Sequence, residues 1–187
     1  ALIRLLKREW IIDERKISLS ASFGIAVYPK HGTNPKALMQ NAELAMYRCR
    51  ELGGQGYFSF YSNEMSKEVK EQLTIEQHLR DVLKLDELSL NYQPVYCFSE
   101  GVAQLASAEV LVRWSNRFLG QVGPDKFIPI AERTGQIIEI GNWILATACK
   151  QGMRWLEQGF NNLKLAVNVS PRQLKHPEFI QEVEFIL

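Results

Sequence analysis

Two charged side chains, Glu109 and Arg113, lie within the largely apolar stretch 105–114. If this stretch is a β-strand, alternate residues share a face, so that Glu109, Leu111 and Arg113 point one way and the apolar even-numbered residues point the other. In a parallel barrel the charged face would line the lumen near its mouth, where a buried charge needs a charged partner or a metal ion. A salt bridge between Glu109 and Arg113 at a sheet edge is the alternative.

Asn168 lies at the carboxyl end of a second expected strand, 163–169. Parallel barrels carry their chemistry at the carboxyl ends of their strands. If the two strands are neighbours, Glu109 and Asn168 become candidates to hold one hard cation through oxygen atoms. An ordinary loop residue before a helix is the alternative for Asn168.

The segments around these strands predict a parallel α/β sheet. Residues 124–135 begin with Pro-Asp and end with Gly, which is typical of a helix, and the apolar periodicity of 137–158 predicts a second helix. A strand is expected at 88–93, and Ser170-Pro171 forms a good helix start. Strand, crossover helices and strand make a βαβ unit.

The first third of the chain shows separate signals. Residues 1–10 have an amphipathic helical pattern, 17–28 begin with the alternation of a strand, and 57–61 form a short aromatic strand. Asn34 followed by Pro35 predicts the start of a helix that ends at Gly53-Gly54. The helical patterns at both ends of the chain predict a piece of a longer protein.

Residues 63–85 are polar, rich in Glu and Lys, and carry a narrow apolar stripe. This pattern predicts a solvated helix that joins two folded units. We therefore divide the chain into a first domain at 1–61, a helical linker at 62–78 and a second domain at 79–187. The stripe either packs on its own domains or forms a dimer contact.

Composition excludes several classes. The 187 residues carry a net charge of +1, which argues against a nucleic-acid clamp. No apolar run approaches the ~20 residues of a membrane span. Three scattered cysteines without a CxxC pair argue against a disulfide framework and a zinc site and favour the reducing cytoplasm. His31, His78 and His176 are expected on the surface; Trp114, Trp143 and Trp155 are expected in packing, with guanine stacking as the alternative.

Five motifs in order resemble the start of an EAL domain, the bacterial domain that binds or hydrolyses cyclic di-GMP. They are YQP at 92–94, AEVLVRW at 108–114, PDKFIPIAERTG at 124–135, GNWIL at 141–145 and AVNVSPRQL at 166–174. Upstream, SASFGIAVYP and NAELAMYRCRELGGQGYFSFY resemble the carboxyl-terminal part of a GGDEF domain, the diguanylate cyclase fold. The resemblance implies a mixed α/β fold: the end of a cyclase-like domain, a connecting helix, and the first part of a TIM-like (β/α)₈ barrel.

The resemblance also assigns roles to particular residues. Glu109 and Asn168 match metal ligands of the family, which implies Mg²⁺ or Mn²⁺ as cofactor. Gln93, Leu111 and Arg113 match positions that contact the cyclic dinucleotide, with Arg113 facing a phosphate. Guanidinium groups suit phosphate oxygens, and carboxylate and amide oxygens suit these cations.

The sequence departs from the family patterns at several positions. The middle Ala of EAL is Val110, which by parity points toward the helices, and WSNRFLG stands where the family usually has a His-Pro pair. In the cyclase-like part, Glu43 replaces the usual Asp, and Arg50 and Gly54-Gln55 occupy positions where the family carries Lys and Arg-Asn for the triphosphate. These changes indicate a degenerate, regulatory cyclase domain.

The resemblance implies a metal-dependent cyclic di-GMP phosphodiesterase that produces linear pGpG. The catalytic residues are expected after Leu187, so that these 187 residues alone are expected to be inactive. A catalytically silent cyclic di-GMP receptor or scaffold is the alternative. A homodimer through the EAL part or the linker helix stays open. The expected location is the cytoplasm, with any membrane anchor outside this stretch.

Overall fold

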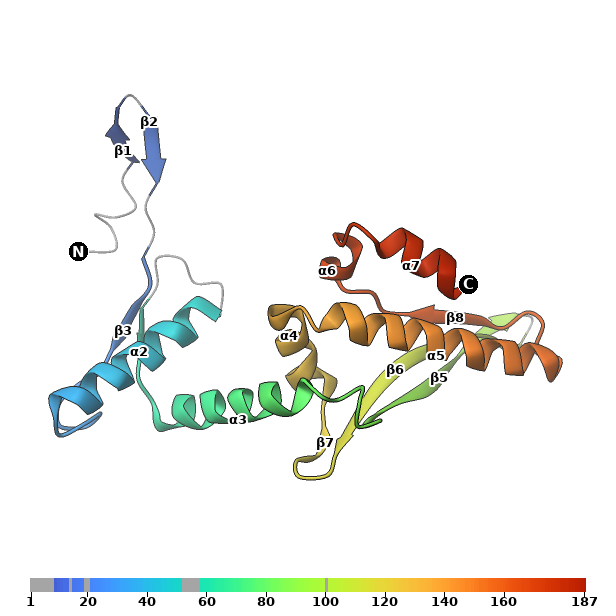
Figure 1. The fold of residues 1–187 in the computed structure, drawn as a ribbon, viewed down its shortest axis with the longest axis horizontal. Helices are drawn as coiled ribbons and strands as arrows, with labels where there is room; N and C mark the ends of the chain where they lie inside the picture. Colours follow the sequence, from blue (N-terminus) through green and yellow to red (C-terminus); the bar gives the residue numbers. More distant parts are fainter. Residues whose placement is uncertain (1–8, 14, 19–20, 52–57, 100) are drawn as a thin grey trace. The chain divides into compact units, whose positions relative to one another are not determined.

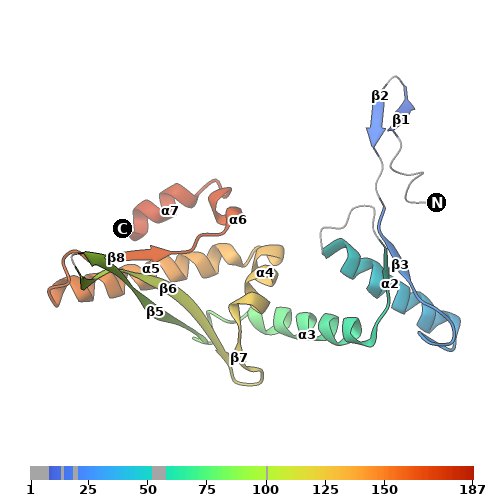
Figure 2. The same cartoon turned by 180° about the vertical axis from the view of Figure 1, so that it is seen from behind.

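The computed structural model describes residues 9–13, 15–18, 21–51, 58–99 and 101–187. The chain divides into two compact units, Ala1–Leu73 and Thr74–Leu187. Figures 1 and 2 show the elements of each unit from opposite sides. None of the helices in these described ranges combines the length and hydrophobicity needed to span a bilayer.

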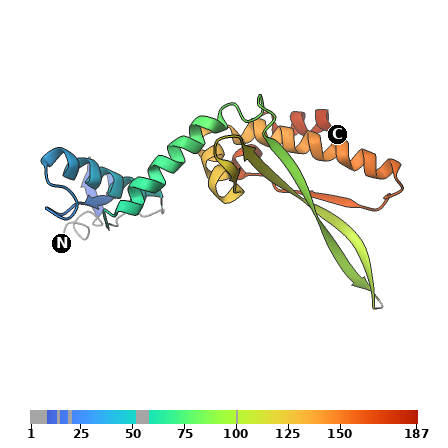
Figure 3. The ribbon, with the colours of Figure 1, turned by 90° about the horizontal axis from the view of Figure 1, so that it is seen from below.

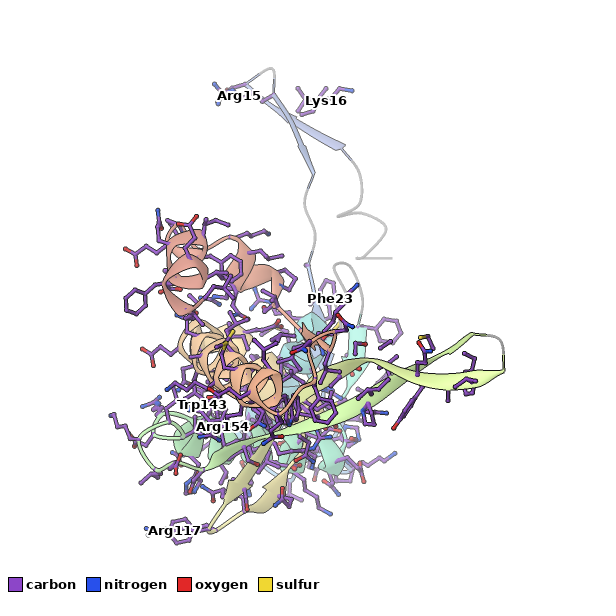
Figure 4. All side chains as sticks on the ribbon, turned by 90° about the vertical axis from the view of Figure 1, so that its right-hand side faces the viewer. Arg15, Lys16, Phe23, Arg117, Trp143 and Arg154 are labelled. Atoms are coloured by element: carbon purple, nitrogen blue, oxygen red, sulfur yellow. The ribbon has the colours of Figure 1, made fainter. Side chains whose placement is uncertain are left out.

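The first unit begins with an antiparallel hairpin of β1 (Glu9–Ile12) and β2 (Arg15–Ser18). Figure 4 labels Arg15 and Lys16 on β2. The helix predicted over residues 1–10 is wrong at its end, because residues 9–10 belong to β1 and pair with β2. Residues 1–8 lie outside the described part of the chain.

The rest of the first unit packs two short parallel strands against one helix. These elements are β3 (Phe23–Ile25), α2 (Pro35–Glu51) and β4 (Phe58–Phe60). The Asn34 side chain accepts a hydrogen bond from the Ala37 backbone N–H at 2.9 Å, so the predicted helix start is confirmed. A Cβ at Gly24 would lie 1.8 Å from a carbonyl oxygen of α2, which explains why a glycine interrupts β3.

Helix α3 (Asn63–Leu79) lies where the linker helix was predicted, and the division between the two units falls within it, after Leu73. Its last turns are not fully solvated, because Ile75 and Leu79 are buried in the core of the second unit. The linker limits at 62 and 78 stay a prediction.

The second unit is built on a four-stranded sheet of β5 (Leu88–Ser99), β6 (Val102–Asn116), β7 (Gly120–Val122) and β8 (Lys164–Val167). Strand β6 is central: β5 pairs with it antiparallel on one side, and β7 (antiparallel) and β8 (parallel) pair with it elsewhere along its length. Figure 3 shows β5 and β6 as one long twisted ribbon. The sheet is therefore mixed, because its first strand runs against β6.

Helices α4 (Pro124–Thr134) and α5 (Ile137–Glu157) connect β6 to β8, as the βαβ prediction required. They cover the even-numbered face of β6. The core there includes Trp114, which is fully buried and meets the ring of Phe127 edge-on at 5.5 Å. Gly135 ends α4 with a φ of 92°, a left-handed conformation that favours glycine.

After β8 the chain forms α6 (Pro171–Leu174) and α7 (Phe179–Ile186). Ser170 and Gln173 form a capping box at the start of α6. The Gln173 side chain is buried against α5, where a Cβ at Gly141 would lie 1.8 Å from its amide nitrogen. The glycine of the GNWIL motif therefore makes room for the amide of SPRQL.

Candidate functional site

The structure brings Glu109 and Asn168 into direct contact although 59 positions separate them. The Asn168 amide Nδ2 donates a hydrogen bond to Glu109 Oε1 at 2.9 Å. Strands β6 and β8 pair in parallel with Glu109 opposite Ala166, so that Asn168, two residues later, falls on the same face. The register of the two strands therefore builds this contact.

Strand β5 adds Gln93 to the same face. Gln93 lies directly opposite Glu109 in the antiparallel register of β5 and β6. Residues opposite each other on neighbouring strands share a face of the sheet. Gln93 is exposed and Glu109 is half-buried. Three strands thus contribute one polar side chain each to a surface open to solvent.

Leu111 and Arg113 continue this face along β6. Both are half-buried, and they lie opposite Asn91 and Ser89 of β5. The Arg113 guanidinium donates to the backbone oxygen of Val112 at 3.1 Å. Among the described residues, neither Glu109 nor Arg113 takes part in an ion pair, so the sheet-edge salt bridge between them does not form.

On the opposite face of β6, the Glu87 carboxylate accepts several side-chain hydrogen bonds that sequence analysis did not predict. Glu87 accepts hydrogen bonds from Trp114 Nε1 at 2.9 Å and from Asn116 Nδ2 at 2.9 and 3.1 Å. Its desolvation acts to raise the pKa of Glu87, but these donors outweigh it and hold that pKa below its usual value. Asn116 also accepts from the backbone N–H groups of Phe118 and Leu119. The unusual WSN sequence therefore closes the β6–β7 hairpin, at whose tip Figure 4 labels Arg117.

A second set of contacts fixes the loop that carries Asn168. The Ser170 hydroxyl donates to Glu132 Oε1 at 2.6 Å. The Arg172 guanidinium donates to the backbone oxygens of Glu132 and, at 3.1 Å, of Arg133. Hydrogen bonds thus join the AERTG motif of α4 to the SPRQL motif. These contacts fix the loop that begins at Asn168. Glu132 is the member that sequence reasoning missed.

The tryptophans pack as predicted. Trp114 is fully buried, Trp143 packs against the core from α5, where Figure 4 labels it, and the Trp155 ring meets Tyr92 edge-on at 4.8 Å. Burial against these groups raises the pKa of Tyr92, although the charge of Arg154 opposes it.

The histidines differ from one another. His31 accepts a hydrogen bond from the Val27 backbone N–H at 3.1 Å, and His78 lies beside the ring of Phe118. His176 is half-buried and its Nδ1 atom is shielded from solvent. His31 and His78 are half-buried as well, and His176 differs from them in that two glutamates, Glu178 and Glu182, each bring a carboxylate oxygen to within 4.8 Å of a ring nitrogen.

In the first unit, Glu43 and Arg50 are exposed on α2. Gly54 and Gln55, where the sequence departs from the family pattern, lie outside the described residues. The assignment of a degenerate cyclase domain therefore stays a prediction.

Two family models match the chain. The EAL domain matches residues 76–187, and the diguanylate cyclase GGDEF domain matches residues 1–55. The two matches follow each other in the order expected from the motifs.

Curated relatives of both parts are similar along most of the chain. A bifunctional diguanylate cyclase/cyclic di-GMP phosphodiesterase, MucR of Pseudomonas aeruginosa, is 36% identical over 182 residues, which are 97% of this chain and 26% of the relative. The cyclic di-GMP phosphodiesterase PdeR of Escherichia coli is 37% identical over 159 residues, 85% of this chain and 23% of the relative. The chain thus spans about a quarter of the length of these relatives.

A solved structure shares the fold. The PaMucR phosphodiesterase in complex with c-di-GMP is 34% identical, with a TM-score of 0.57 over 61% of this chain and 45% of that chain.

Proposed function

The chain belongs to the EAL domain family, with a segment matching the GGDEF family before it, and on this premise we propose that it carries part of a cyclic di-GMP phosphodiesterase site. In this proposal the face of Gln93, Glu109, Arg113 and Asn168 binds cyclic di-GMP and a divalent cation. The dinucleotide is then hydrolysed to linear pGpG. The observation that carries the proposal is the contact between Glu109 and Asn168 at 2.9 Å on an open face. Metal-dependent phosphodiester hydrolysis needs such oxygen donors beside space for a substrate.

The donor set of this face fits Mg²⁺ or Mn²⁺. Glu109 offers a carboxylate and Asn168 an amide oxygen, which are the hard oxygen ligands that these ions prefer. The Asn168 amide now presents its nitrogen to Glu109. Rotation of the amide by half a turn would present its oxygen instead. When bound, the cation supplies Lewis acidity at the phosphate and a nucleophile from water.

The remaining residues of the face suit a cyclic dinucleotide. Arg113 has no carboxylate partner among the described residues, so its guanidinium is available for phosphate oxygens. Leu111 lies between Arg113 and Glu109 and offers an apolar contact. Gln93 can donate to and accept from a base or sugar edge. We assign phosphate binding to Arg113 and positioning of the nucleotide to Gln93 and Leu111.

We further propose that residues 1–187 bind more readily than they hydrolyse. A hexacoordinate cation with two protein ligands remains largely hydrated, and two-metal hydrolysis needs cations ~3.5–4 Å apart with ligands for both. Glu109 and Asn168 alone cannot supply these. Further ligands would come from a longer protein, whose reaction would take place in the reducing cytoplasm, where the three free cysteines of this chain stay reduced.

The test follows Mn²⁺-dependent conversion of cyclic di-GMP to pGpG by the full-length protein, together with dinucleotide affinity. We expect turnover in the natural protein and its loss in Glu109→Gln. Binding without metal-dependent turnover in the natural protein would overturn hydrolysis and indicate the receptor alternative. Absence of both would overturn the whole proposal.

A further inference from the structure

Three potential metal ligands lie close together around the turn between α6 and α7. Figure 1 shows these two helices after β8. The three ligands are His176 of the connecting loop, Glu178 at the start of α7 and Glu182 one turn later. One ligand atom from each lies within 4.8 Å of the others. This cluster shares no residue with the Glu109–Asn168 face.

Two residues of the cluster carry a polar atom without the partner that buried polar atoms normally have. His176 Nδ1 and Glu182 Oε2 are shielded from solvent, and neither has a hydrogen-bond partner in the described part of the chain. Buried polar atoms are nearly always paired, so an unpaired ring nitrogen and an unpaired carboxylate oxygen on two residues of the cluster call for a ligand. Glu178 is exposed and leaves a path from solvent.

The electrostatics of the cluster also call for a cation. Glu178 and Glu182 are four residues apart, a spacing at which like charges on a helix repel each other. None of the ion pairs among the described residues neutralises either carboxylate. A divalent cation between the two would convert this repulsion into attraction.

The backbone around the cluster is preorganised. The His176 backbone N–H donates to the Gln173 carbonyl at 2.9 Å, and the Gln173 side chain is buried in the capping box of α6. Pro177 restricts the conformation of His176 before it. The helix start at Phe179 then sets Glu182 one turn above Glu178, on the same side of α7.

We propose that His176, Glu178 and Glu182 form a zinc-binding site that fixes the start of α7. One imidazole nitrogen and two carboxylate oxygens suit zinc, whereas magnesium and calcium prefer oxygen ligands alone. Tetrahedral zinc holds its ligand atoms about 3.3–3.6 Å apart, so each atom must move inward by less than about 1 Å, within the freedom of glutamate rotamers. The proposal departs from the expectation that the cysteines form no zinc site and that the histidines lie on the surface without ligand partners.

The test measures zinc binding to the full-length protein in a Glu109→Gln background, which removes the carboxylate ligand proposed for the Glu109–Asn168 face. Competition with a chromogenic chelator gives the affinity, and the visible absorption of Co²⁺ reports its coordination. We expect the Glu109→Gln protein to bind one equivalent of zinc at the cluster. The zinc affinity should fall by about tenfold or more when His176→Ala or Glu182→Gln is added to this background.

The matched control is Glu184→Gln, an exposed carboxylate of the same helix outside the cluster, which should leave zinc affinity unchanged. Circular dichroism of each variant separates loss of binding from loss of folding. Equal zinc affinity in the folded His176→Ala variant, or no zinc binding by the background protein, would overturn the proposal. Neither result depends on phosphodiesterase activity.

Discussion

The two faces of β6 differ in polarity and in burial. One face carries Glu109, Leu111 and Arg113, which are half-buried, and it is shared with Gln93 of β5 and with Asn168 after β8. The other carries Val110 and Trp114, buried under α4 and α5. One strand thus separates the groups available for chemistry from those that hold the fold. Substitutions on the first face should therefore alter function, and substitutions on the second should alter stability.

The largest effect is expected on the buried face. Trp114→Ala removes a fully buried side chain together with its hydrogen bond to Glu87 and its contact with Phe127. The free energy of unfolding should fall by about 3–5 kcal/mol, measured by urea denaturation. A loss below about 1 kcal/mol would show that this face does not carry the core.

Glu109→Gln should produce the next largest effect, on the open face. Loss of the carboxylate would remove one of the two metal ligands that we propose on this face, and turnover of cyclic di-GMP by the full-length protein should fall by about 10²–10³-fold. The free energy of unfolding should change by less than about 1 kcal/mol, since the hydrogen bond to Asn168 is exposed. A destabilisation equal to that of Trp114→Ala would break the comparison of the two faces.

Arg113→Ala should weaken dinucleotide binding by about tenfold, because a charge-assisted bond to phosphate is lost. Isothermal titration calorimetry measures this. Arg117→Ala is the matched control, because Arg117 lies on the exposed hairpin tip, over the ring of Phe118. If both variants bind equally, Arg113 does not face the ligand.

The smallest effect is expected on the pH dependence of the free energy of unfolding, through Glu87 at the buried face. Because the pKa of Glu87 is held below its usual 4.5, its carboxylate stabilises the fold at neutral pH, and this contribution is lost as the pH falls below that value. Glu87→Gln should flatten the fall of unfolding free energy between about pH 5 and 3, by less than about 1 kcal/mol. The exposed Glu139→Gln should leave the slope unchanged.

Local signals in the sequence predicted much of this arrangement. Asn34 and Gly135 mark helix ends in the structure, and the alternation separated the two faces of β6 correctly over residues 107–114, whereas the register with β5 shifts between Leu105 and Ser107. Alternation does not fix which strand pairs with which, or in what direction. The antiparallel pairing of β5 with β6 therefore could not be predicted from it.

Local sequence patterns could not predict contacts between residues distant in sequence. Glu87 meets Trp114 and Asn116 across 27 and 29 positions, and only the register of β5 and β6 brings them together. His176 gave no signal because the groups near it are glutamates, which are common on helix surfaces. The geometry of the turn before α7, rather than residue type, unites them.

The loop that carries Asn168 is hydrogen-bonded to a helix as well as to the sheet. Ser170 is bonded to Glu132 of α4, and the neighbouring Arg133 pairs with Glu76 near the end of α3 at 2.9 Å. A twist or shift of α3 would thus be passed by two adjacent residues of α4 to the amide beside Glu109. The geometry of the proposed cation site thus depends on contacts of α4 and α3 that involve neither Glu109 nor Asn168.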